Sequence, residues 1–72
     1  MMIKVLAKDN LAKKRIREGM TGVDVAKKIG ITKAGYYSIE RGDNGVSPAN
    51  AKKISEVLDS SFDELFRMEG EK

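Results

Sequence analysis

The sequence predicts a small all-α protein, a compact bundle of five short helices. Apolar residues recur at the three- and four-residue spacing of a helix face in five successive stretches of the chain. Each stretch begins beside a Ser, Thr, Asp or Asn that can cap a helix, and three of them end at a glycine. The turn signal Asp43-Asn44-Gly45 has no alternating strands beside it, so we expect a loop there and not a hairpin.

Length and composition exclude several classes of protein. The 72 residues make one domain, residues 1–72, which buries only about 60% of the surface that its unfolded chain exposes. The chain has no cysteine and no histidine, so it lacks disulfides, the usual zinc ligands and the usual general base or thiol of an enzyme. We expect no metal, no cofactor, no small-molecule ligand and no catalytic site, and added stability from association with a second copy.

The charges are distributed unevenly along the chain. Residues 1–42 carry ten Lys/Arg against four Asp/Glu, a net +6, whereas residues 43–72 carry four against seven, a net −3. Such polarity suits a domain that turns one face toward a polyanion, and a solvated surface with chance asymmetry is an equal alternative. Lys4 and Lys8 interrupt the apolar N-terminus, so we expect neither a signal peptide nor a membrane span, and a cytoplasmic protein.

The first helix is expected to run from a cap at Asp9 or Asn10 to about Glu18, with Gly19 ending it. Before it, residues 2–7 alternate weakly between the two faces of a strand, and both a short strand and a mobile arm remain open. The residues expected on the inner face of the first helix are Leu11, Ala12, Arg15 and Ile16.

Residues 23–41 predict two helices joined by a tight turn, a helix-turn-helix. Thr21 and Asp24 form a short capping box for the first of them, and Gly30 supplies the left-handed residue that ends it, with Ile31 buried in the turn. Thr32 caps the next helix, which continues to Arg41 and stops at Gly42. The side chains expected to face inward are Val25, Ala26, Ile29, Tyr36 and Ile39, and those expected to face outward are Lys33, Ala34, Tyr37 and Ser38.

Two further helices complete the predicted bundle. Ser47 followed by Pro48 starts the fourth helix in the favoured order of cap and first position. Ser61 and Glu64 form a capping box for a fifth helix over residues 62–68. The apolar residues expected on these helices are Ala51, Ile54, Val57 and Leu58, then Phe62, Leu65, Phe66 and Met68.

The helix at 32–41 has the features of one that reads the major groove of DNA. Such a helix carries short polar or basic side chains in its first turn, while another helix fixes its angle to the duplex. Lys33 can donate to guanine, Ser38 can pair with several base edges, and Ala34 or Tyr37 can lie against a thymine methyl. Two of these residues have an alternative role: Thr32 can serve as a helix cap alone, and Tyr37 can have a structural role. The expected base contacts are Thr32, Lys33, Ala34, Tyr37 and Ser38.

Residues around the preceding helix are expected to contact phosphates. Its N-terminus presents backbone N–H groups that we expect to be free at Gly22 and Val23. Lysines on the helix can release counterions from DNA, with simple solvent exposure as the alternative. The expected phosphate contacts are Thr21, Gly22, Val23, Lys27, Lys28, Arg41 and Asn44.

Residues 10–67 resemble the lambda-repressor-like helix-turn-helix domains of phage repressors, Cro and the XRE transcriptional regulators. The stretches that carry the resemblance are GMTGVDVAKKIGITKAGYYSIERG and SPANAKKISEVLDSSFDELF. The resemblance implies a sequence-specific DNA-binding regulator, in the first place a repressor, which inserts the helix 32–41 in the major groove of double-stranded DNA as a homodimer. It also implies a partly buried salt bridge between Arg15 and Glu40. The dimer interface that it implies lies on the C-terminal helix, at Phe62, Leu65, Phe66 and Met68.

The sequence departs from this family at two positions. Gly22 stands where these domains often have a glutamine that contacts a phosphate, and Asp43 lies in a loop that is often basic. Both departures favour a second hypothesis, an antitoxin-like or other protein-interaction module on the same scaffold. Salt separates the two hypotheses, because binding through several phosphates weakens steeply with salt and apolar docking does not.

Overall fold

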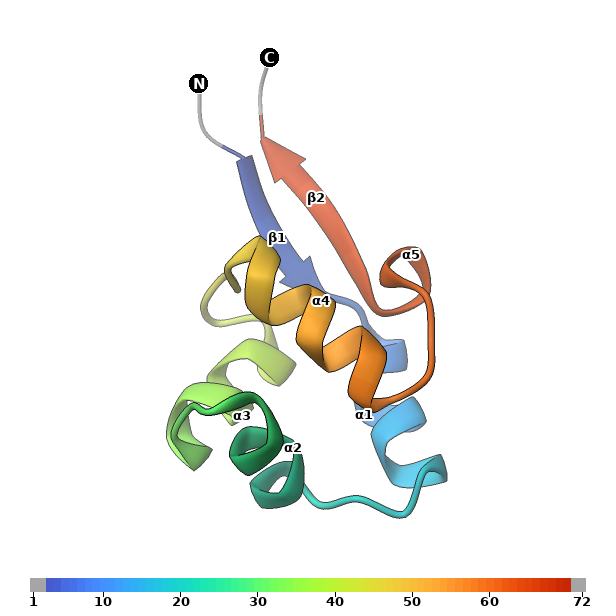
Figure 1. The fold of residues 1–72 in the computed structure, drawn as a ribbon. Coiled ribbons are helices and arrows are strands. Elements are labelled where there is room, and N and C mark those ends of the chain that lie inside the picture. Colours follow the sequence, from blue (N-terminus) through green and yellow to red (C-terminus); the bar gives the residue numbers. More distant parts are fainter. Residues whose placement is uncertain (1–2, 71–72) are drawn as a thin grey trace.

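The computed structural model describes residues 3–70, which form five helices and a two-stranded sheet (Figure 1). The five predicted helices are present, but the all-α class is right only for the body of the molecule, because the two ends of the chain pair as strands. Among the described residues, no helix has the length and hydropathy needed to cross a bilayer. The elements in order are β1 (Ile3–Ala7), α1 (Asp9–Arg17), α2 (Gly22–Ile29), α3 (Lys33–Arg41), α4 (Pro48–Val57), α5 (Phe62–Leu65) and β2 (Phe66–Gly70).

The sheet corrects the predicted fifth helix. α5 has only four residues, and the chain turns to an extended conformation at Phe66, with φ −134° and ψ 162°. β2 then pairs antiparallel with β1, from Ile3 opposite Gly70 to Ala7 opposite Phe66. Residues 66–69 alternate apolar and charged side chains, a pattern that suits a strand as soon as a partner strand is available. Of the two options for the N-terminal segment, the strand is the one observed, and residue 2 lies outside the described range.

Side-chain caps begin four of the five helices as predicted. Thr21 and Asp24 form a full capping box, Thr32 accepts from the Gly35 N–H, and Ser47 and Ser61 cap α4 and α5. The predicted cap of α1 was wrong. Lys8 occupies the cap position without a side-chain hydrogen bond, and its own N–H donates to the Leu65 carbonyl at 2.8 Å. The hydrogen bond that continues the pairing of the two strands therefore sets the start of α1 at Asp9. A cap at Asp9 would have started the helix one residue later.

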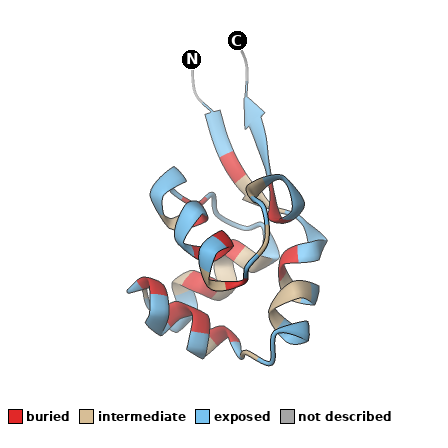
Figure 2. Cartoon of the chain, turned by 45° about the vertical axis from the view of Figure 1, so that its right-hand side comes forward, coloured by how far each residue is buried: buried red, intermediate tan, exposed pale blue. Residues whose placement is uncertain are grey.

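The core lies where the helices face one another and at the base of the sheet, as Figure 2 shows. The apolar positions predicted for α2 and α3 are all buried. Ile16, predicted to face inward, is instead 64% exposed, because α1 turns Leu11 and Arg15 toward the body and Ile16 points past it. Val57 and Ile31 are half-buried at the edge of the core. The buried apolar residues are Val5, Leu11, Val25, Ala26, Ile29, Tyr36, Ile39, Val46, Ala51, Ile54, Leu58, Leu65 and Phe66.

A hydrogen-bonded network of charged side chains joins α1 to α3 beside the hydrophobic core. The Arg15 guanidinium donates to both carboxylate oxygens of Glu40, with Nε–Oε2 at 2.7 Å and Nη2–Oε1 at 3.0 Å. Arg15 also donates to the Met20 carbonyl, and the buried Tyr36 hydroxyl donates to Glu40 at 2.7 Å. The two charged side chains keep only 12% and 10% of their surface in solvent. The family resemblance implied this pair, and it explains a charged residue on the inner face of α1.

Arg15→Met should lower the free energy of unfolding by about 3 kcal/mol, the low end for a broken buried pair because some solvent contact remains. The loss arises because Glu40 stays charged without its partner. The double variant Arg15→Met/Glu40→Gln removes both charges, and should cost less than Arg15→Met alone. Urea unfolding of the three proteins measures these differences. A double variant that is less stable than the single one would contradict this account of the pair.

Tyr36 should make stability fall at alkaline pH. Burial first, and then the hydrogen bond to Glu40, raise the pKa of the Tyr36 hydroxyl well above its usual value. The folded protein therefore keeps this hydroxyl protonated, while the unfolded chain loses the proton above about pH 10. Above that pH, unfolding free energy should fall by up to about 1.4 kcal/mol per pH unit more than in Tyr36→Phe. Urea unfolding at a series of pH values above about 10 measures this difference. If the unfolding free energies of the two proteins change equally with pH, this assignment is contradicted.

Candidate nucleic-acid interface

α2 and α3 meet at a turn whose geometry follows from Gly30. This glycine has φ 83° and ψ 32°, a left-handed conformation that residues with a Cβ rarely adopt. The N–H groups of Gly30 and Ile31 both donate to the Ala26 carbonyl, at 2.9 and 3.0 Å, and so close the end of α2. Thr32 begins α3 directly afterwards, and the small Ala26 side chain is buried between the helices. The turn therefore sets the angle between α2 and α3.

The first turn of α3 is open to solvent. Thr32, Lys33 and Ala34 are exposed at the N-terminal end of α3, ahead of its buried residues Tyr36 and Ile39. The Thr32 hydroxyl oxygen accepts from the Gly35 N–H at 3.0 Å, which leaves its own proton free to donate. A Cβ on Gly35 would lie only 3.0 Å from this oxygen, so the glycine leaves room for the cap. Polar and small groups thus stand at the exposed N-terminal end of α3.

Tyr37 is not turned outward as predicted. Its hydroxyl oxygen accepts from the Gly22 N–H at 3.2 Å, its ring packs edge-on against Tyr36, and the Arg15 guanidinium lies 5.9 Å from the ring centroid. The ring reaches the backbone of α2 because Gly22 has no side chain. A Cβ there would lie 2.6 Å from the ring carbon Cε1 and overlap the ring. The Gly22 N–H is therefore engaged, which corrects the prediction that it is free.

The remaining expected phosphate contacts lie at the rim of α2 and α3. Lys27 and Lys28 are exposed on α2, and Val23 is half-buried. Arg41 is exposed and forms an ion pair with Asp43 at 2.9 Å. At the head of α2, the backbone hydrogen bond from Thr21 is the main cause that lowers the pKa of Asp24, which keeps a negative charge beside the exposed Thr21.

A hydrogen bond joins α3 to the loop that follows it. The Asn44 side-chain amide donates to the Ser38 hydroxyl oxygen at 3.0 Å, so an expected phosphate contact holds an expected base contact in place. Ser38 is half-buried and Asn44 is exposed. The loop therefore has a role in orienting the exposed side of α3, which its turn-forming sequence alone did not indicate.

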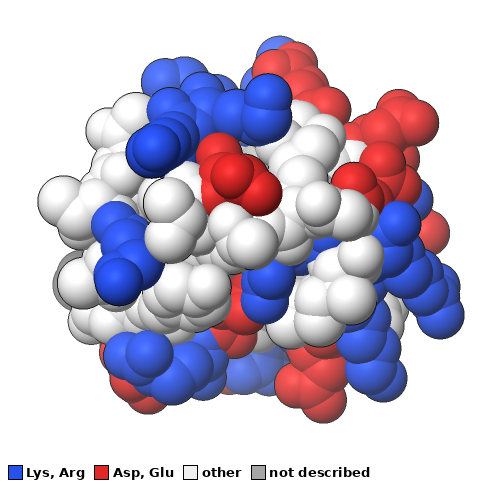
Figure 3. All heavy atoms as spheres, turned by 90° about the horizontal axis from the view of Figure 1, so that it is seen from below, with Lys and Arg blue, Asp and Glu red and all other residues white. Residues whose placement is uncertain are grey.

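Among residues 3–70, the Lys and Arg side chains at the end that carries α2 and α3 do not form a continuous patch. Figure 3 views this end, and its Lys and Arg side chains lie in separate groups, with acidic groups and uncharged atoms between them. The exposed start of α3 carries the cation Lys33 beside the uncharged Thr32 and Ala34. Such an arrangement suits phosphate contacts at the sides and uncharged or singly charged contacts in the centre.

The residues predicted for a helical dimer interface lie elsewhere than expected. Leu65 and Phe66 are 0% and 1% exposed, in the core of their own chain, and cannot contact a second copy. Phe62 is half-buried, and Met68 lies on β2 with 67% of its surface exposed. The predictions for Leu65 and Phe66 were wrong because they placed residues 62–68 on one helix, while those for Phe62 and Met68 stay predictions. The weak alternation of residues 2–7 and the alternation of residues 66–69 are the sequence signals of the two strands that changed their environment.

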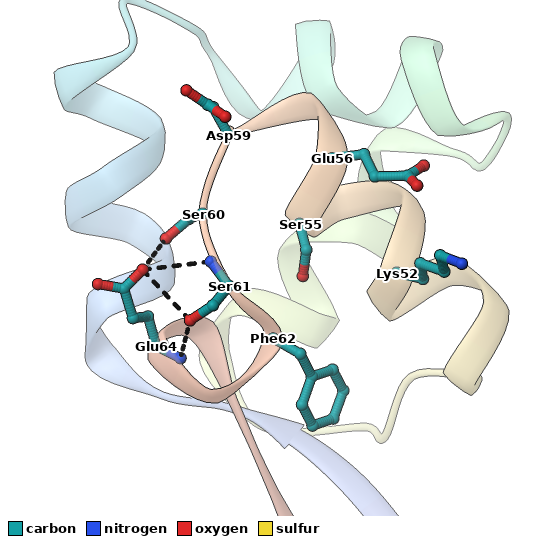
Figure 4. A pocket seen from close by; sticks show the side chains of 8 residues that line it. All are labelled: Lys52, Ser55, Glu56, Asp59, Ser60, Ser61, Phe62 and Glu64. Atoms are coloured by element: carbon teal, nitrogen blue, oxygen red, sulfur yellow. Dashed lines mark hydrogen bonds between the residues drawn. The ribbon is translucent and has the colours of Figure 1, made fainter.

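A hollow of about 690 Å³ lies away from this interface, between α4 and α5 (Figure 4). Glu64 accepts hydrogen bonds there from the Ser60 hydroxyl and the Ser61 N–H, and the first of these is the main cause that lowers its pKa. The Ser55 hydroxyl donates to the Ala51 carbonyl. These polar groups serve the capping box and the helix, and they do not converge on the hollow. Its lining residues are Lys52, Ser55, Glu56, Asp59, Ser60, Ser61, Phe62 and Glu64.

Gly22→Ala should destabilise the protein by about 1 to 3 kcal/mol, the usual cost of an inserted group in a packed site, because the Tyr37 ring must leave its place. In a Tyr37→Ala background the same substitution should cost less than about 0.5 kcal/mol, since the obstructing ring is gone. Urea unfolding of the four proteins gives this coupling. Equal costs in both backgrounds would show that the Tyr37 ring does not limit residue 22.

Comparison with known proteins agrees with this geometry. A helix-turn-helix family model matches residues 11–65 of the chain. The restriction-modification controller protein C.AhdI from Aeromonas hydrophila superposes with a TM-score of 0.71 at 27% identity, over 78% of this chain and 85% of that one. SinR, a master regulator for biofilm formation solved in complex with DNA, superposes with a TM-score of 0.69 at 30% identity, over 76% and 89%. No curated protein sequence matches the chain significantly.

A further solved structure shares the fold over almost the whole chain. The transcriptional regulator VanUg superposes with a TM-score of 0.70 at 20% identity, covering 99% of this chain and 92% of that one. The family model spans α1 to α5, and within that span lie the capped helices, the turn at Gly30 and the exposed start of α3. This chain belongs to the helix-turn-helix family of XRE-type, lambda-repressor-like DNA-binding transcription regulators.

Proposed function

We propose that this protein is a sequence-specific regulator of transcription, which inserts α3 into the major groove of DNA. The observation that carries the proposal is the exposed first turn of α3, held away from the body by the turn at Gly30. The Arg15–Glu40 pair and the Tyr37–Gly22 contact brace α3 from behind. A braced helix with an open, polar N-terminal turn has the geometry of a recognition helix.

The proposed base contacts are Thr32, Lys33, Ala34 and Ser38. Lys33 is the one long cation of the first turn and would donate to guanine N7 and O6. Ala34 presents a methyl group to a thymine methyl, while the hydroxyls of Thr32 and Ser38 donate to base or phosphate oxygens. Tyr37 acts mainly as a brace, and we propose that the proton of its hydroxyl, which the contact with Gly22 leaves free, is directed to a nearby phosphate.

The proposed phosphate contacts flank this helix on two sides. On the side of α2, the proposed contacts to phosphates are Thr21, Val23, Lys27 and Lys28. On the side of the loop after α3, they are Arg41 and Asn44. Arg41 would exchange its exposed pair with Asp43 for a phosphate, at little cost because such surface pairs are weak. Gly22 contributes its small size and not a free N–H.

The proposed working form is a homodimer that represses transcription. Two copies related by a two-fold axis read half-sites about 34 Å apart on one face of the duplex. SinR, solved with DNA, is the neighbour that supports DNA as the ligand. Double-stranded DNA is the only partner besides a second copy that this proposal requires.

A protein-interaction role on the same scaffold is the second candidate. It gains support from two donors that are already engaged, since the Gly22 N–H donates to Tyr37 and Arg41 pairs with Asp43. An antitoxin-like module would dock a protein with the same exposed helices. Its binding would depend little on salt, unlike binding to phosphates.

Lys33→Ala should reduce discrimination between the preferred duplex and its variants by about 1 to 3 kcal/mol, because one base contact is lost. Selection of bound duplexes from a random pool supplies the preferred sequence, and competition titrations then measure the preference. Lys27→Ala is the matched control, with the same change in charge one helix away. It should weaken all duplexes alike and reduce the slope of log K against log salt by about one unit.

Each outcome bears on one part of the proposal. An unchanged preference in Lys33→Ala would remove this residue from base reading. A wild-type protein that selects no sequence, and whose binding to any duplex is absent at low salt, would contradict the regulatory function and leave protein interaction as the better reading.

A further inference from the structure

Ser38 lies beside the loop that follows α3, and Gly42 sets the fold of that loop. This glycine ends α3 in a left-handed conformation, with φ 81° and ψ 10°, and turns the chain back along the helix. The Ser38 carbonyl then accepts from the N–H groups of Asp43 and Asn44, at 3.0 and 3.4 Å. This return brings two side chains together, with the Asn44 amide Nδ2 3.0 Å from the Ser38 hydroxyl oxygen.

The loop is anchored on both sides of Asn44. After it, the Val46 N–H donates to the Val5 carbonyl at 2.9 Å, and the Val46 side chain is buried in the core. Before it, Asp43 pairs with Arg41 at 2.9 Å. Asn44 itself is exposed, and its backbone lies outside the left-handed region. A different side chain at this position therefore strains neither the core nor the backbone.

The contact with Asn44 leaves the Ser38 hydroxyl with a proton to donate. A hydroxyl has one proton and two lone pairs that accept. Asn44 uses one lone pair of Ser38, and none of the hydrogen bonds within residues 3–70 uses the proton. Ser55 on α4 shows the usual alternative, since its hydroxyl donates to the carbonyl of Ala51, four residues earlier. The Ser38 proton instead needs an acceptor outside the chain.

Ser38 is placed to meet a base edge. It follows Ala34 by one helical turn, so both side chains lie on the side of α3 that is proposed to read bases. In the major groove, guanine presents the acceptors N7 and O6, thymine presents O4, and cytosine presents only its N4 donor. Against cytosine, Ser38 could only accept. Its own proton would then be unpaired once the interface excludes water, which is unfavourable.

We propose that Asn44 is a positioning residue that makes Ser38 a hydrogen-bond donor, and that Ser38 thereby selects guanine or thymine over cytosine at the base that it meets. This inference rests on the proposed function, because it requires α3 in the major groove. An oxygen that accepts one hydrogen bond also donates its own proton more strongly. The Asn44 amide has a second N–H, which stays free for a phosphate, so one side chain links a phosphate contact to base reading.

Ser38→Ala locates the base pair concerned. Duplexes selected from a random pool supply the preferred site, and competition titrations compare the two orientations of a G·C pair at each of its positions. This pair is informative because guanine presents only acceptors and cytosine only a donor. At one position, the wild-type protein should prefer one orientation about tenfold, because the other leaves the Ser38 proton unpaired. Ser38→Ala should lose this preference.

Asn44→Asp then tests the polarity of the Ser38 hydroxyl. Aspartate has the shape of asparagine but only accepts, so it would take the Ser38 proton and leave only lone pairs for the base. The orientation ratio at that position should therefore fall at least about tenfold, to parity or beyond. The added negative charge weakens both orientations alike and cancels in the ratio. In the matched background, Ser38→Ala/Asn44→Asp should have the same ratio as Ser38→Ala, because no hydroxyl is left to invert.

A base analogue tests the same polarity without a change at Asn44. Pyrimidin-2-one lacks the amino group of cytosine. Placed opposite guanine in the preferred orientation, it should leave the advantage of wild type over Ser38→Ala unchanged, because Ser38 contacts the guanine. Loss of that advantage would show that Ser38 accepts from cytosine, and would overturn the proposal.

Two other results would also overturn the role of Asn44. One is a Ser38→Ala variant that changes no orientation ratio, and the other is an Asn44→Asp variant that keeps the wild-type ratio. In both cases a wild-type protein that still selects a sequence leaves the proposed function intact. A wild-type protein that selects no duplex would contradict the proposed function and this inference with it.

Discussion

The hydrogen-bonded ion pair between Arg15 and Glu40 is the interaction on which the arrangement of the helices depends most. It joins α1 to α3 across a separation of 25 residues, with Tyr36 donating to the same carboxylate. Each polar atom of this network has a partner, so its partial burial leaves no charge unpaired. Because Glu40 and Tyr36 both belong to α3, the network fixes the rotation of α3 about its own axis. That rotation decides which side chains face outward.

Gly22 and Tyr37 together set how closely α2 and α3 approach. The absent side chain of Gly22 is what allows the Tyr37 ring to lie against the start of α2. The contact gives α3 a second support, and it occupies an N–H that would otherwise be directed at a phosphate. The same glycine thus strengthens the positioning of α3 and weakens the anion site at the head of α2. The first effect favours specificity, since rigid supports hold contacting groups in place.

The exposed surface of α2 and α3 and the exposed end of the sheet lie far apart on the molecule. α2 and α3 lie at one end, and the open end of the sheet lies at the other (Figure 1). A domain of this size gains little from its own core, so the pairing of the chain ends contributes by closing the base of the core with Val5 and Phe66.

The sequence by itself determined the features that depend on neighbours within a turn or two of helix. The capping boxes at Thr21 and Ser61, the left-handed Gly30 and the inner stripe of α2 follow from spacings of one to four residues. The family was indicated by the resemblance of residues 10–67 to the lambda-repressor-like domains. The tertiary structure decided the fate of residues 66–70, which became a strand because β1, more than 50 residues earlier, offers a partner. It also turned Tyr37 inward onto Gly22 and buried Leu65 and Phe66. Local spacing could not show these features, because each depends on which distant segment lies beside the residue once the chain has folded.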